Sequence, residues 1–147
     1  MIESAITRLE YLCNIAAPFL TAIGEPSFSL KTSPENWSKK EIIGHLIDSA
    51  INNHQRFVRA QFEQVPTIVY DQNKWNKFNY YQQMDGQQII SFWVIYNRQL
   101  VQLFKCISIE NLALECKTGT ETPLTIGFLF NDYVQHQEHH LRQVIVY

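Results

Sequence analysis

Histidines are the residues of this chain whose type and spacing are best suited to chemistry, and the sequence contains five of them. Two, His136 and His140, lie four residues apart near the C-terminus. On a helix this spacing places both imidazoles on one face, where they can bind the same metal ion. The same spacing occurs in the HExxH zinc motif, but Gln137 stands where that motif has its glutamate base. His139 points toward the polar side of the predicted helix and cannot easily share an ion with the other two.

A third histidine, His45, lies at the boundary between the polar and apolar faces of another predicted helix. Its same-face neighbours form a polar row: Glu41, Ser49, Asn52 and Arg56. His54 lies nine residues further on, about 180° around the helix, so it cannot face the same site. Three imidazoles leave coordination positions open for water or substrate, which is typical of catalytic rather than structural sites. The alternative is that these histidines are solvated or boundary residues without a metal.

Other side chains are expected to surround such a site. We expect Asn52, Arg56 and Tyr133 to line the mouth of a substrate pocket, although Asn52 and Arg56 suit a solvated helix face equally well. Trp37 is expected to pack as an anchor just before its helix. Each metal-binding imidazole should donate its other N–H to an acceptor. The candidate acceptors are three carboxylates: Asp48, Asp132 and Glu138.

The histidines must be positioned by helices, because four segments carry the three- to four-residue apolar period of amphipathic helices. The first runs from about Ile2 to Thr21. The second begins at a capping box formed by Ser38 and Glu41 and extends to about residue 62. The third and fourth follow N-cap residues Asp85 and Thr125 and reach about residues 107 and 145. Four such helices predict an all-α four-helix bundle, with residues 1–147 as a single domain.

The order of the helices follows from the levels of the histidines. His45 lies about 10 Å into the second helix, and His136 and His140 lie about 14 and 8 Å from the end of the fourth. These levels agree if the second and fourth helices are antiparallel. Residues 63–84 show no period and are numerous enough to cross the bundle when extended. We therefore predict an up-down-down-up bundle with a long crossover between the second and third helices.

Composition excludes several classes of function. The 12 basic and 14 acidic side chains give a formal charge of −2, and no Lys/Arg cluster indicates nucleic-acid binding. No apolar run is long enough to span a membrane, and the N-terminus does not resemble a signal peptide. The three cysteines form no CxxC pair and are expected to be reduced thiols. The sequence thus predicts a soluble, cytoplasmic protein.

Two segments resemble signatures of a known family. Residues 36–49, NWSKKEIIGHLIDS, resemble the W-S-x-x-E-x-x-x-H-L-x-D signature of the DinB-like superfamily, and residues 133–143, YVQHQEHHLRQ, resemble its H-x-x-H-H-x-x-Q signature. The resemblance implies a four-helix bundle of unusual connectivity with a divalent metal on His45, His136 and His140. It also implies kinship with thiol S-transferases that use bacillithiol and with relatives that act with mycothiol, among which homodimers are common.

The leading interpretation is a metal-dependent enzyme that transfers a low-molecular-weight thiol to a small electrophilic substrate, or hydrolyses such a substrate. The expected ion is zinc or nickel, although imidazole ligands also suit iron and copper. The alternative is a non-catalytic metal- or ligand-binding helical module. These interpretations differ in whether a metal-dependent reaction rate exists.

Overall fold

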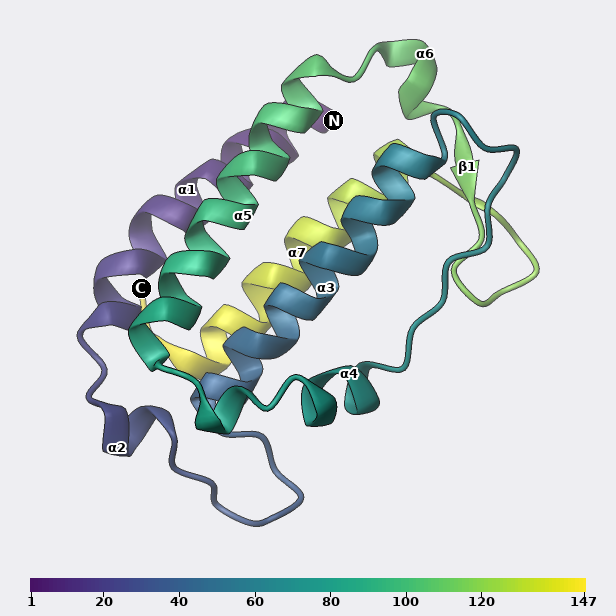
Figure 1. Ribbon diagram of the computed structural model, residues 1–147. Helices are drawn as coiled ribbons and strands as arrows, with labels where there is room; N and C mark the ends of the chain where they lie inside the picture. The colour runs from purple at the N-terminus through teal and green to yellow at the C-terminus, as the bar shows by residue number, and fades with distance from the viewer.

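Four long helices lie side by side in the computed structural model, which describes residues 1–147 (Figure 1). They are α1 (Ile2–Thr21), α3 (Lys39–Arg59), α5 (Gly86–Cys106) and α7 (Ile126–Val144). Each buries one apolar stripe in a common core, as the periodicity predicts. No helix is both long enough and apolar enough to cross a bilayer.

The connectivity is up-down-down-up, as predicted. Figure 1 shows α3 and α5 running in one direction and α1 and α7 in the other. Each of α1 and α3 packs against both α5 and α7. The long connection from residue 60 to residue 85 carries the chain back along α3, so that α5 starts at the same end of the bundle as α3. As a result α3 and α7, the two helices that carry the histidines, are antiparallel neighbours.

Aromatic rings fill one level of the core. The rings of Phe104 on α5 and Phe130 on α7 stack with centroids 3.6 Å apart, and Phe57 on α3 meets Phe104 edge-on at 4.7 Å. The edge-to-face arrangement of Phe57 and Phe104 is a favourable geometry for an aromatic pair, whereas the stacked rings of Phe104 and Phe130 lie almost face to face. These contacts join three of the four helices at the end of the bundle away from the start of α3.

Side-chain caps start the helices where the sequence predicts them. The Ser38 side chain accepts a hydrogen bond from the Glu41 amide, and the Glu41 carboxylate accepts one from the Ser38 amide, which completes the capping box. The side chains of Asp85 and Thr125 cap α5 and α7 by accepting a hydrogen bond from the amide three residues further on. The predicted end of α3 near residue 62 is wrong, because α3 ends at Arg59. The chain turns there, with the Phe62 and Glu63 amides both donating to the Arg59 carbonyl.

Short elements lie in the connections. They are α2 (Glu25–Phe28), α4 (Gln72–Phe78), a 3₁₀ turn η1 (Tyr81–Gln83), α6 (Ile109–Leu112), β1 (Glu115–Cys116) and β2 (Leu124–Thr125). The strands β1 and β2 pair antiparallel, with Gly119 at φ 110° in the turn between them. The sequence does not predict the short helices, because four to seven residues are too few to show a helical period.

Candidate metal centre

The structure brings His45, His136 and His140 together. One nitrogen from each ring contributes to a cluster whose atoms all lie within 4.8 Å of one another. The Nε2 atoms of His45 and His136 are 3.1 Å apart, and the three ring centroids are separated by 4.6 to 4.9 Å. His45 comes from the second turn of α3, while His136 and His140 share one face of α7 near its end. The antiparallel packing of α3 and α7 places these turns at the same level.

The second nitrogens of two rings face polar side chains. Nδ1 of His140 lies 2.9 Å from Oε1 of Gln143, one turn further along α7. Nδ1 of His136 lies 3.5 Å from Oγ of Ser49, which is one turn after His45 on α3. Nδ1 of His45 is buried and has no hydrogen-bond partner. Because the Nδ1 atoms of His136 and His140 face Ser49 and Gln143, the Nε2 atoms of these two rings are the nitrogens available to the cluster.

Burial keeps the rings of His45 and His136 neutral. Desolvation, reinforced by repulsion from His136 and His140, lowers the pKa of His45 to about 3. Desolvation, with smaller contributions from His140 and His139, lowers the pKa of His136 to about 4. Both imidazoles are therefore uncharged at neutral pH, and an uncharged imidazole has the lone pair that binds a cation.

The donor set and its spacing suit a transition-metal ion. Two ligand nitrogens at bonds of about 2.1 Å on a tetrahedral ion lie about 3.4 Å apart, close to the 3.1 Å between the Nε2 atoms of His45 and His136. Neutral imidazoles favour zinc, nickel, iron and copper over magnesium or calcium, which prefer oxygen ligands. The residues present therefore fit a divalent transition metal.

The carboxylates expected to hold the imidazoles do not do so. Asp48 is buried and its Oδ1 accepts hydrogen bonds from Tyr81 and Asn79, while Glu138 forms ion pairs with Arg8 and Arg142. Asp132 is exposed. The expectation considered only acidic residues close in sequence, whereas the groups that face the rings are the uncharged Ser49 and Gln143. Both lie one helical turn from a ligand position, which is the signal that could have identified them.

Trp37 covers one side of the centre. Its ring lies 4.8 Å from the ring of His45, tilted by 33°. Trp37, which was expected to pack as an anchor before its helix, packs its ring against a histidine of the cluster. Trp37 also lines a hollow of about 350 Å³ between the loop before α3 and the α4–η1 segment.

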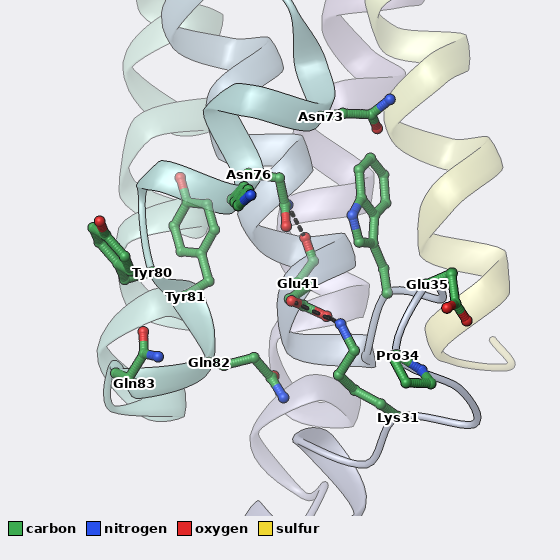
Figure 2. A pocket seen from close by; sticks show the side chains of 12 residues that line it. Lys31, Pro34, Glu35, Glu41, Asn73, Asn76, Tyr80, Tyr81, Gln82 and Gln83 are labelled. Carbon is green, nitrogen blue, oxygen red and sulfur yellow. Dashed lines mark hydrogen bonds and ion pairs between the residues drawn. The ribbon is translucent and has the colours of Figure 1, made fainter.

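This hollow, which we call the Trp37 hollow, is mostly polar. It is lined by Lys31, Pro34, Glu35, Trp37, Glu41, Asn73, Asn76, Lys77, Tyr80, Tyr81, Gln82 and Gln83. Figure 2 shows the Lys31 ammonium against the Glu41 carboxylate, at 2.8 Å, and the Asn76 amide against the Glu41 carbonyl, also at 2.8 Å. Tyr80 takes the left-handed backbone conformation, φ 55°, which is strained for a bulky side chain and is often found at functional sites.

The three residues expected to line a substrate pocket are buried and are not among those that line the Trp37 hollow. Tyr133 is 2% exposed and donates a hydrogen bond to Asn97 in the core. Asn52 donates to the carbonyl of Asp48 within α3. Arg56 donates to the carbonyl of Ile68 and to Asn53. All three lie on the faces of α3 and α7 that pack into the bundle, and Asn52 and Arg56 do not lie on an exposed polar face as the sequence suggested they could.

The remaining histidines lie outside the cluster. His54 forms a hydrogen bond with Tyr96 on α5 through its Nδ1, at 2.8 Å, in agreement with its predicted orientation away from His45. His139 is exposed and lies against Gln143.

Comparison with known proteins agrees with this architecture. The sequence matches the model of the DinB superfamily over residues 12–144. No curated protein matches the sequence. A solved structure described as YfiT from Bacillus subtilis, a probable metal-dependent hydrolase with an unusual four-helix bundle topology, is similar with a TM-score of 0.87 and 18% identity, over 97% of this chain and 83% of that one.

A second solved structure, the mycothiol-dependent maleylpyruvate isomerase, is similar with a TM-score of 0.80 and 11% identity. The match covers 98% of this chain but 60% of the isomerase, so this chain spans less than two thirds of that protein. At such low identities the two structures establish the fold alone.

Proposed function

This chain belongs to the DinB superfamily, and from that premise we propose that it is a divalent-metal-dependent enzyme acting on a small electrophilic substrate. His45, His136 and His140 are the proposed ligands. The observation that carries the proposal is the convergence of three imidazole nitrogens, from two helices, within 4.8 Å of one another. Zinc or nickel is the proposed ion, because both accept an all-imidazole donor set.

The side chains around the three histidines suit a catalytic metal site. A divalent ion held there supplies Lewis-acid chemistry, which activates water or a thiol toward an electrophile. Three protein ligands leave room for a reactant, which a structural site would not. Ser49 and Gln143 hold the Nδ1 side of two rings and so fix which nitrogen is presented. Trp37 shields the ring of His45 on one side.

We place the substrate in the Trp37 hollow. Its volume of about 350 Å³ falls in the range of small-molecule sites. Its lining offers amide and phenol groups for hydrogen bonding, together with the exposed Lys77. Trp37 contacts both the hollow and His45, and none of the three histidines lines the hollow, so the reacting group of a molecule bound there must extend past Trp37 to reach the proposed centre.

Two reaction classes fit this site, hydrolysis and thiol transfer. The description of the Bacillus subtilis protein as a probable hydrolase favours the first, and the thiol dependence of the isomerase favours the second. They differ in the nucleophile, which is water in one and a low-molecular-weight thiol in the other. We propose a cytoplasmic location, where such thiols are kept reduced. The three cysteines of this chain are free.

Metal content is the first test. We expect elemental analysis of the purified protein to find about one zinc or nickel ion per chain, and His45→Ala, His136→Ala and His140→Ala each to lose it, because two imidazoles hold an ion weakly. His54→Ala is the matched control, since His54 lies on the same helix as His45 but bonds Tyr96. Full occupancy in all three ligand variants would overturn the proposal.

Activity is the second test. Metal-loaded protein is incubated with activated esters and with alkylating electrophiles, with and without an added low-molecular-weight thiol. Turnover that is abolished by a chelator and by His136→Ala supports an enzyme, and its dependence on the thiol separates transfer from hydrolysis. Metal binding without turnover of any substrate would instead favour the non-catalytic binding module.

A further inference from the structure

Gln137 is a polar residue enclosed in the core beside the proposed centre. It follows His136 on α7 and has no exposed surface. Its side-chain amide uses both ends. Oε1 accepts a hydrogen bond from Nε1 of Trp93 on α5 at 2.8 Å, and Nε2 donates one to the main-chain carbonyl of Leu46 on α3 at 3.3 Å. One side chain therefore connects three helices of the bundle.

The position of these bonds relates them to the histidines. Leu46 directly follows His45, and Gln137 directly follows His136. The bond between Gln137 and the Leu46 carbonyl thus joins α3 and α7 one residue away from a proposed ligand on each helix. Nε2 of His45 and Nε2 of His136, 3.1 Å apart, are held by the same two turns of helix.

The directional character of these bonds gives them a role that packing cannot fill. The buried neighbours of Gln137 on the same side of α7 include Tyr133, whose hydroxyl donates to Asn97 on α5 and not to α3, and the apolar Val134 and Leu141. Apolar contacts are non-directional and tolerate small sliding or rotation of one helix against another. A hydrogen bond weakens steeply when its distance or angle changes. Trp93, fully buried on α5, also fixes which end of the Gln137 amide points to α3.

We propose that Gln137 is a positioning residue of the metal centre: its amide fixes the rotation and depth of α7 against α3, so that the imidazoles of His136 and His45 meet. This inference rests on the proposed function. A glutamate at this position would keep an acceptor for Trp93 but could not donate to the Leu46 carbonyl when ionised. The amide is therefore the group that the position requires, where HExxH proteins have their base.

The test compares Gln137→Met with Tyr96→Phe. Methionine has a similar length and no donor, whereas Tyr96→Phe removes a 2.8 Å hydrogen bond between α3 and α5, from Tyr96 to His54, away from the cluster. Metal-free proteins are titrated with Co²⁺ in competition with a chelator, and the visible absorption of the bound ion is recorded. Circular dichroism verifies that each variant is folded.

For Gln137→Met we expect the Co²⁺ dissociation constant to rise about 10- to 100-fold, with an altered absorption spectrum, as for residues that orient metal ligands. Tyr96→Phe should keep the wild-type constant and spectrum. Trp93→Phe, which leaves the amide of Gln137 without its indole partner, should show a smaller change in the same direction, and it decides the matter if Gln137→Met does not fold.

The outcomes separate this inference from the proposed function. Wild-type affinity and spectrum in Gln137→Met, or in Trp93→Phe if only that variant folds, would overturn the positioning role while leaving the metal centre in place. If the wild-type protein itself does not bind Co²⁺, or if His45→Ala binds it equally well, both the centre and the role of Gln137 are overturned.

Discussion

Imidazole binds a metal only through the lone pair of its neutral form, and burial of His45 and His136 secures that form in the folded protein. Their pKa values are lowered to about 3 and about 4. An ordinary histidine in the unfolded chain titrates near 6.5, so the unfolded state binds more protons as the pH falls below that value. These two residues therefore make the metal-free fold less stable as the pH falls from about 6.5 toward about 4.

Asp48 acts in the opposite direction. It has no exposed surface, its Oδ1 accepts hydrogen bonds from Tyr81 at 2.5 Å and Asn79 at 2.8 Å, and its Oδ2 has no partner. Burial raises the pKa of Asp48 to about 6, against the lowering effect of the two hydrogen bonds. Between about pH 4 and 6 the folded state keeps a proton that the unfolded state has lost. This group therefore favours folding at low pH, and the benefit disappears as the pH rises through about 6.

Replacing Asp48 by asparagine removes this pH dependence while keeping an oxygen that can accept from Tyr81 and Asn79. We expect Asp48→Asn to be more stable than the wild type at pH 7, by up to about 2 kcal/mol, and the difference to shrink toward zero at pH 4. Urea unfolding of the metal-free proteins at several pH values measures it, and comparison of the two proteins cancels the contribution of the histidines. A stability difference that is the same at pH 4 and pH 7 would contradict the buried, ionised state of Asp48.

At the scale of the elements, the long helices could be predicted because each combines an apolar period with a side-chain cap. The bounds of α1 and the caps Ser38, Asp85 and Thr125 agree with the structure. The convergence of the histidines could also be predicted, since it depends only on helical spacing and on the direction of the helices. What the sequence does not disclose is how irregular segments dock on the helices.

The Trp37 hollow is the clearest example of that limit. Its wall combines the loop before α3 with α4 and η1, which lie more than 30 residues further along the chain. The docking depends on individual contacts, such as the Tyr81 ring lying over Gly44 and the Asn76 amide on the Glu41 carbonyl. No period or motif in the sequence encodes such contacts, because each is a single pair of residues.

Gly44 provides a test of how closely η1 docks on α3. A Cβ at Gly44 would lie 2.2 Å from Cδ2 of Tyr81, so Gly44→Ala must displace the Tyr81 ring and weaken its bond to Asp48. We expect this variant to lose about 1–2 kcal/mol, because overpacking outweighs the better helix propensity of alanine. Urea unfolding gives the value.

Gly127 on α7 is the matched control. A Cβ there meets its nearest neighbour, the Leu112 carbonyl, at an ordinary 3.5 Å. Gly127→Ala should therefore gain a few tenths to about 1 kcal/mol from helix propensity. If both glycine variants are stabilised alike, Tyr81 is not held against α3 as closely as described.

For the molecule as a whole, connectivity and function are linked. The crossover between α3 and α5 makes these two helices parallel and leaves α7 antiparallel to α3 (Figure 1). His45 near the start of α3 can then meet His136 and His140 near the end of α7. In a bundle with alternating directions, α3 and α7 would be parallel and the same histidines would lie at opposite ends. The proposed centre is thus a consequence of this particular connectivity, and an ion bound there joins residues about 90 positions apart.

An ion that joins α3 and α7 should stabilise the whole fold, because the unfolded chain does not hold the three imidazoles together. At a free Zn²⁺ concentration about 100-fold above the dissociation constant, binding adds about 2.7 kcal/mol to the free energy of unfolding. In a domain of this size that corresponds to a rise in Tm of about 5–10 °C. Thermal unfolding followed by circular dichroism, with Zn²⁺ and with a chelator, measures the rise. It should persist in His54→Ala and vanish in His136→Ala; an equal rise in His136→Ala would place the stabilising ion elsewhere in the molecule.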